Sequence, residues 1–187
     1  MRKYLDRALV LTKSSLIAQR SLGIDILGQL GVPERTFPDE CVMRLLELLE
    51  LEFDPLILRD IGIALGHLRD PRSIDPQLRF CLHPDWEVRY GVVIGLSGHG
   101  DERAISGLIR LSGDVCPLIR DWATFGLGTL INVDTSAIRE ALYQRLLAED
   151  RQDDDTKIYA EALVGLANRQ DDRNLCRSVG AASQSSG

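Results

Sequence analysis

The sequence DPRSIDPQLRFCLHPDWEVR, which runs from Asp70 to Arg89, decides the fold. It opens on a turn signal, because the side chain of Asp70 accepts hydrogen bonds from nearby backbone N–H groups and Pro71 fixes φ at about −65°. Apolar residues then recur at helical spacing over 74–82. Pro84 ends that helix, since proline cannot continue the hydrogen-bond ladder, and Asp85 is a suitable N-cap for the next helix. The stretch therefore predicts a turn, a helix, a second turn and the start of another helix.

The same unit recurs along the chain at a fixed period. The helix openers Asp54-Pro55, Asp85-Trp86 and Cys116-Pro117 are 31 residues apart (86−55 and 117−86). In that register the following positions align: Ile57, Val88 and Ile119; Leu65, Leu96 and Leu127; Asp70, Asp101 and Asn132. The next unit departs from the register, because Glu140 falls where an apolar residue is expected. A fixed period of this size predicts an array of repeats, in which no unit buries its apolar face alone.

The letters DPRSIDPQLR (70–79) and DWEVRYGVVIGLS (85–97) resemble the short HEAT-like repeat of the phycobilisome-lyase-like family, and the likeness extends over about residues 15–170. The resemblance implies an all-α fold, a right-handed α-α superhelix (a HEAT-like repeat solenoid) of about five helix pairs. Proteins built in this way include bilin lyases, chaperones, scaffolds and regulatory proteins, and a related stack of helices forms alkylpurine DNA glycosylases. The fold alone therefore does not select a function.

The size of the chain predicts one HEAT-like domain over residues 1–180 and a disordered tail over 181–187. Residues 1–31 are interpreted as an N-terminal cap repeat, because the 38 residues from Gly28 to Gly66 depart from the period. Further repeats are expected over 38–68, 72–98, 101–131 and 135–169, with a partial helix over 171–179. The helices expected within them span 2–13, 39–51, 55–68, 74–82, 86–98, 102–112, 117–130, 135–148 and 156–168, and the second helix of the cap repeat is expected to start at a cap formed by Ser14 or Ser15 and to run to 28–31.

Composition and motifs exclude several classes of function. No apolar run approaches the ~20 residues that span a bilayer, so we expect no membrane partner. The charges of MRKYLDR at the start interrupt the apolar region that a signal peptide needs, so we expect a cytoplasmic protein. The net charge of −6, without a basic stripe, opposes binding of nucleic acid. The four cysteines form no C-x-x-C pair and are interpreted as small buried hydrophobes. The sequence contains no phosphate-loop, nucleophile-elbow or dinucleotide-binding motif, so we expect no catalytic residue and no cofactor. The three histidines do not have the spacing of metal ligands, so we expect no metal site.

In the family that the chain resembles, the second helix of each pair lines the concave face. If this holds, equivalent positions of the second helices form columns across that face, and the aromatic and arginine side chains there are of the types that carry binding energy. The predicted binding groove consists of Arg59, Asp60, Ile63, His67, Tyr90, Ile94, Asp121, Trp122 and Phe125. For Ile63, Ile94 and Phe125 the alternative is packing between adjacent helices. Arg89 and Arg120 occupy a repeated arginine position, for which we expect a structural role, such as bonding to carbonyl groups.

The sequence therefore predicts a non-enzymatic scaffold module that binds a protein or a peptide in the concave groove. The alternative, which the resemblance alone implies, is a bilin-lyase-like protein or a tetrapyrrole-binding chaperone; lyase-like activity is the one enzymatic possibility that the family offers. The oligomeric state and the identity of the partner are not predicted.

Overall fold

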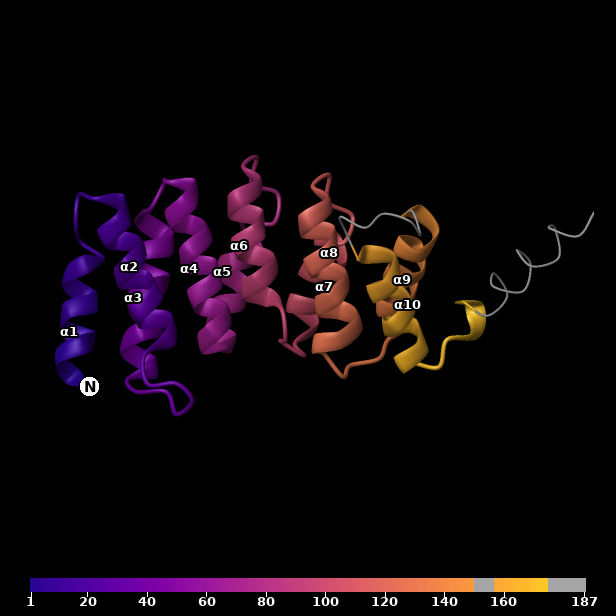
Figure 1. Cartoon of the computed structure of the whole chain (residues 1–187), viewed down its shortest axis with the longest axis horizontal. Coiled ribbons are helices and arrows are strands. Elements are labelled where there is room, and N and C mark those ends of the chain that lie inside the picture. Colours follow the sequence, from indigo (N-terminus) through magenta and orange to yellow (C-terminus); the bar gives the residue numbers. More distant parts are fainter. Residues whose placement is uncertain (150–156, 175–187) are drawn as a thin grey trace, which may run out of the picture. The chain divides into compact units, whose positions relative to one another are not determined.

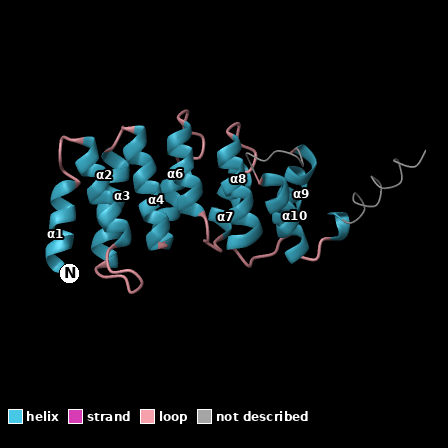
Figure 2. Cartoon of the chain, viewed as in Figure 1, coloured by secondary structure: helices cyan, strands magenta, loops and turns pink. Residues whose placement is uncertain are grey.

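The computed structural model describes residues 1–149 and 157–174, and all of the regular structure in these ranges is helical (Figure 2). Ten α-helices follow one another as five consecutive pairs, α1/α2 to α9/α10. The predicted all-α solenoid class is confirmed. The hand of the superhelix and the extent of the domain stay predictions, and the calls on 175–179 and 181–187 fall outside the described residues. The chain divides into two compact units, residues 1–107 (unit 1) and 108–187 (unit 2), which are described separately.

Unit 1 contains three complete helix pairs, and the turns that join α1 to α2, α3 to α4 and α5 to α6 lie on the same edge (Figure 1). Helix α4 packs against both α2 and α6, so the second helices of the three pairs lie side by side. The elements are α1 (Arg2–Leu11), α2 (Ile17–Gln29), α3 (Pro38–Leu51), α4 (Pro55–Leu68), the 3-10 turn η1 (Pro71–Ser73), α5 (Ile74–Leu78), α6 (Trp86–Leu96) and the first part of α7 (Glu102–Leu111).

Unit 2 begins within α7, and its helix α10 packs against both α8 and α9. The single helix expected over 117–130 is α-helical only to Phe125 and continues as one π-helical turn. The elements are α8 (Pro117–Phe125), the π-helix η2 (Gly126–Leu130), α9 (Ser136–Ala148), α10 (Ile158–Asn168) and the 3-10 turn η3 (Asp172–Asn174).

Capping side chains set several of the helix starts. The carboxylate of Asp54 accepts from the backbone N–H of Leu56 at 3.0 Å, and that of Asp85 accepts from Glu87 at 2.9 Å, as a residue at an N-cap does. The expected helix over 74–82 is wrong in length, because α5 ends at Leu78. Beyond it the chain forms tighter turns, in which Phe80 and His83 each bond the carbonyl three residues earlier. Leu82, the last apolar residue of the expected helix, is therefore 73% exposed.

The core of each unit is made of aliphatic side chains, as the low aromatic content predicts. In unit 1 the fully buried residues include Leu5, Ile24, Leu27, Leu45, Ile57, Ile61 and Leu65. In unit 2 they include Leu108, Ile119, Leu127, Ile138, Leu142, Ile158 and Leu166. Cys41 and Cys81 are buried among such side chains, which confirms their interpretation as small hydrophobes, and burial raises the pKa of the Cys41 thiol to about 11. Cys116 is half-buried, and Cys176 lies outside the described residues.

A glycine seam, formed by Gly62 and Gly66 of α4 and Gly91 and Gly95 of α6, brings these two helices into backbone contact. A Cβ atom at Gly62 would lie 2.6 Å from the carbonyl carbon of Gly91, which is closer than real Cβ contacts allow. Gly91 in turn lies against the backbone of Arg59. Glycine is required here because only a residue without a side chain permits this approach, and the seam fixes how α4 and α6 present their remaining side chains.

A turn clamp, built from an Asp-x-Arg sequence and one further acid, joins successive repeats. In unit 1, Asp70 accepts from the backbone N–H and the guanidinium of Arg72, and the same guanidinium reaches Asp39 of α3 at 2.7 Å. The equivalent clamps are Asp101 and Arg103 with Asp75 of α5, and Asp171 and Arg173 with Glu140 of α9. Each turn is therefore tied to the first helix of the preceding repeat.

In the described ranges no helix is both long and apolar enough to cross a membrane.

Candidate interaction surface

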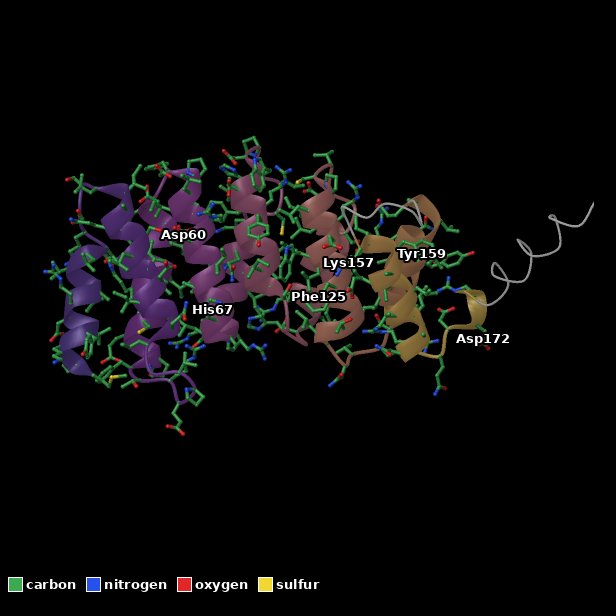
Figure 3. The ribbon with its side chains drawn as sticks, viewed as in Figure 1. Asp60, His67, Phe125, Lys157, Tyr159 and Asp172 are labelled. Atoms are coloured by element: carbon green, nitrogen blue, oxygen red, sulfur yellow. The ribbon has the colours of Figure 1, made fainter. Side chains whose placement is uncertain are left out.

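In unit 1 the predicted site residues belong to α4 and α6, and we call the side of the unit where α2, α4 and α6 pack next to one another the α2/α4/α6 face. Asp60 and His67 lie two turns apart on α4 (Figure 3). Asp60 is 8% exposed, whereas His67 is open to solvent. Ile63, Tyr90 and Ile94 are half-buried. Half-burial is compatible with both surface recognition and packing between helices, so the groove assignment of these three residues stays a prediction.

A network of charged and polar side chains connects the three helices of this face. The hydroxyl of Ser21 on α2 donates to Asp60 on α4. The guanidinium of Arg59 donates to the other oxygen of Asp60 from Nε at 3.0 Å and from Nη2 at 2.9 Å. The same guanidinium donates from Nη1 to Glu87 of α6 at 2.8 Å. Asp60 is thus a nearly buried carboxylate with both oxygens bonded, and Arg59 is held by two acids.

Asp25 of α2 stands beside this network with a different environment. Among the described residues it forms no hydrogen bond or ion pair that would compensate its charge. Partial burial raises the pKa of the Asp25 carboxyl, the negative charge of Asp60 raises it further, and His67 and Arg59 act in the opposite direction. Its side chain remains exposed to solvent.

Unit 2 carries the other three predicted site residues, on α8. The rings of Trp122 and Phe125 meet edge to face, with centroids 5.9 Å apart and planes at 80°. Asp121 accepts a hydrogen bond from the backbone N–H of Lys157. Lys157 and Phe125 are both labelled in Figure 3. Its Oδ1 atom is buried without a hydrogen-bond partner among the described residues, and burial raises the pKa of this carboxyl. The nine predicted residues therefore form one group in each unit, and a single groove that includes all nine stays a prediction.

The repeated arginines have the structural role that the sequence predicts. Nη1 of Arg89 donates to the carbonyl oxygens of His83 and Pro84, six and five residues earlier. Arg120 repeats this pattern on the carbonyls of Asp114 and Val115, and it also pairs with Glu149. Sequence reasoning missed a third member, because Arg20 of the cap repeat bonds the carbonyls of Ser14 and Ser15 and pairs with Glu52. These arginines hold the turns in front of three of the second helices, α2, α6 and α8.

Three residues of the α2/α4/α6 face were also missed, namely Ser21, Asp25 and Glu87. The signal for the first two is present in the sequence. The 38-residue offset of the cap repeat places Ser21 in the column of Arg59 (59−21) and Asp25 in the column of Ile63 (63−25). Glu87 has no such signal, because its role depends on the reach of Arg59 across the seam.

A pocket in unit 1, near the turn between α3 and α4, is another candidate surface. Leu49, Phe53, Leu58 and Phe80 provide its apolar lining, and Phe53 is 87% exposed. Charged side chains at its margin include Arg79, which pairs with Glu50. Over residues 1–149 and 157–174, no three His, Cys, Asp or Glu side chains are grouped to hold a metal ion.

Comparison with known proteins identifies the repeats. Residues 42–128 match the family of HEAT repeats. A part of the chain is 33% identical over 113 residues to "Regulatory-associated protein of TOR 1" of Arabidopsis thaliana. The matched part is 56% of this chain and 8% of that protein. Protein YibA of Escherichia coli K12 is 25% identical over 164 residues, 84% of this chain and 56% of the relative. The chain thus spans less than two thirds of either relative.

Proposed function

We propose that this chain, in which residues 42–128 are HEAT repeats, is a non-enzymatic interaction module that binds a protein or peptide segment on the α2/α4/α6 face. The observation that carries the proposal is the arrangement of this face. Three helices are held together by the glycine seam and by the bonds of Arg59 and Asp60, so their outer side chains have fixed positions. A rigid platform loses little conformational entropy when it binds a partner.

The side chains offered by this platform are suitable for recognition. Tyr90 combines an apolar ring with a hydroxyl group, and Asp25 and His67 supply accessible polar groups around it. The Trp122 and Phe125 pair of unit 2 is a separate candidate contact, which we do not join to this face. The compartment that we assign is the cytoplasm, in keeping with the buried free thiols of unit 1.

The names of the relatives give limited support. The Arabidopsis protein is named as a regulatory protein associated with TOR, which is an interaction role. Because the match covers 8% of that protein, its partner is not transferred to this chain.

The test is to select peptides that bind the full chain from a random phage-displayed library and to measure their affinity by fluorescence anisotropy. We expect Tyr90→Ala to weaken binding about 10-fold, as truncation of an interface aromatic does. The matched control is Phe53→Ala, which removes an exposed aromatic side chain from the pocket near the turn between α3 and α4. Circular dichroism establishes that both variants are folded.

The opposite result would reject the proposal. If the selected peptides bind Tyr90→Ala as tightly as the unmodified chain and lose affinity for Phe53→Ala, the binding surface is the pocket and not the α2/α4/α6 face.

A further inference from the structure

The α2/α4/α6 face has an excess of negative charge that its own residues do not balance. Two carboxylates, from Asp60 and Glu87, bond the guanidinium of Arg59, and the carboxylate of Asp25 feels the charges of Asp60, His67 and Arg59. Arg59 is already engaged by Asp60 and Glu87, with Nη2 and Nη1 at 2.9 and 2.8 Å from their oxygens. Among the described residues, Asp25 is therefore the carboxylate of the three that has no hydrogen-bonded or ion-paired cation, although the charges of His67 and Arg59 act on it.

This charge destabilises the folded chain at neutral pH. A carboxyl group whose pKa is higher in the folded than in the unfolded state favours folding when it is protonated, and this contribution is lost as the pH rises through the folded-state value. Asp25 is such a group, because burial and Asp60 together raise its pKa against the weaker influence of His67 and Arg59. A side chain that lowers stability in the free protein is a candidate for a role in binding.

The position of Asp25 allows a partner to reach it. Its side chain is exposed, whereas Asp60 is 8% exposed and has both oxygens occupied by Ser21 and Arg59. Ile63 of α4 has the same register position as Asp25 of the neighbouring α2, Tyr90 of α6 has that of Arg59, and both side chains are half-buried. A ligand that contacts Asp25 therefore meets a carboxylate with apolar surface beside it.

We propose that the partner of this face is a basic peptide segment, which presents a lysine or arginine side chain to Asp25 and an apolar side chain to Ile63 and Tyr90. The inference rests on the interaction module proposed above and names the chemistry of its partner. A cation placed at Asp25 removes the repulsion from Asp60, so binding recovers the stability that the free face lacks. An acidic segment would be repelled, because it adds a further negative charge to the carboxylates of this face.

The experiment uses the peptides selected on the full chain and a version of each in which every Lys and Arg is replaced by Gln. We expect the selected peptides to carry basic residues and their Gln versions to bind at least 10-fold more weakly. Asp25→Asn should weaken binding of the basic peptides by a similar factor, with little effect on the Gln versions. Glu34→Gln, which removes an exposed acid from the loop after α2, is the matched control and should bind as the unmodified chain does.

A second measurement separates a binding role from damage to the fold. Asp25→Asn removes the repulsion from Asp60, so its urea unfolding midpoint should be higher than that of the unmodified chain while its affinity for basic peptides is lower. A variant that loses affinity because it is misfolded would show a lower midpoint.

Two outcomes overturn the inference in different ways. Peptides that depend on Tyr90 and are acidic or neutral, or that bind Asp25→Asn normally, reject a basic partner and leave the interaction module in place. Peptides that depend on neither Tyr90 nor Asp25 reject the proposed function together with the inference.

Discussion

Arg169 is a charged side chain inside unit 2, with 7% of its surface exposed. It follows the last residue of α10, and its two terminal nitrogens donate to carbonyl groups at the ends of α10 and of the π-helix η2. The acceptors are the carbonyl oxygens of Leu127, Gly128, Ile131, Val133 and Gly165, at 2.6–3.2 Å. Burial lowers the pKa of this guanidinium. One side chain therefore satisfies polar backbone groups that two helix ends would otherwise leave unpaired.

We expect Arg169→Met to lower the free energy of unfolding by about 3 kcal/mol, because the methionine retains apolar bulk and leaves buried carbonyl groups without a donor. Urea unfolding followed by circular dichroism measures the change. Arg110→Met removes an exposed arginine of α7 and should alter stability by less than about 0.5 kcal/mol. Equal unfolding midpoints for the two variants would show that the carbonyl contacts of Arg169 contribute nothing.

At the scale of the element, the contact between α4 and α6 depends on missing side chains. The seam glycines allow the two backbones to touch, and a Cβ atom at Gly62 would meet the backbone of Gly91, which cannot rotate away as a side chain would. A helix interior otherwise favours alanine over glycine, so these glycines are explained by packing and not by helix propensity.

Gly62→Ala should therefore destabilise the chain by about 2 kcal/mol, as overpacking of a close contact does, although alanine is the better helix former. The comparison variant is Gly113→Ala, where the nearest atom to a new Cβ is the carbonyl oxygen of Arg110 at 3.5 Å. Chemical denaturation should show a clear loss of stability for the first variant and little change for the second. A stabilised Gly62→Ala chain would contradict the close approach of α4 and α6.

The same scale shows what could be predicted from the sequence. The expected helix over 55–68 has the bounds of α4, because Asp54 and Pro55 mark its start through local chemistry. The helix expected over 74–82 is too long, since its apolar spacing continues through turns that are no longer α-helical. The repeat columns selected Arg59 and Asp60, which the structure joins in one network, and their role in binding stays a prediction. They left out Glu87, because its contact with Arg59 depends on the distance between two helices. They also gave no sign of Arg169, whose acceptors on η2 and on the turn after it lie 36–42 residues earlier in the sequence.

At the scale of the whole molecule, the turn clamps recur in both units and respond to pH in the same direction. The guanidinium of Arg103 holds the pKa of Asp101 at about 2, and Arg72 and Arg173 lower the pKa values of Asp70 and Asp171. For a carboxyl group with a lowered folded-state pKa, the stabilising contribution is present above the unfolded value of about 3.9 and is lost as the pH falls through the folded value.

The free energy of unfolding should therefore decrease steeply between about pH 4 and about pH 2, where these clamps become protonated. Asp101→Asn should make the decrease shallower, because one titrating clamp is removed. Glu102→Gln, which neutralises the adjacent exposed acid, should leave the slope unchanged. Denaturant titrations at a series of pH values provide the slopes, and identical curves for Asp101→Asn and the unmodified chain would show that this clamp does not contribute.

The turn clamp also bears on how such an array grows by duplication. Each of the clamps takes its arginine and first aspartate from one turn and its second acid from the first helix of the preceding repeat. A copied repeat brings both halves of this connection with it. Its arginine can bond the acid of the preceding repeat, and the acid on its first helix can bond the arginine of the following repeat. A new junction then needs no second mutation to create a matching residue. Where the clamp is kept, the exposed positions of each copy are free to diverge toward different partners without loss of the joint between repeats.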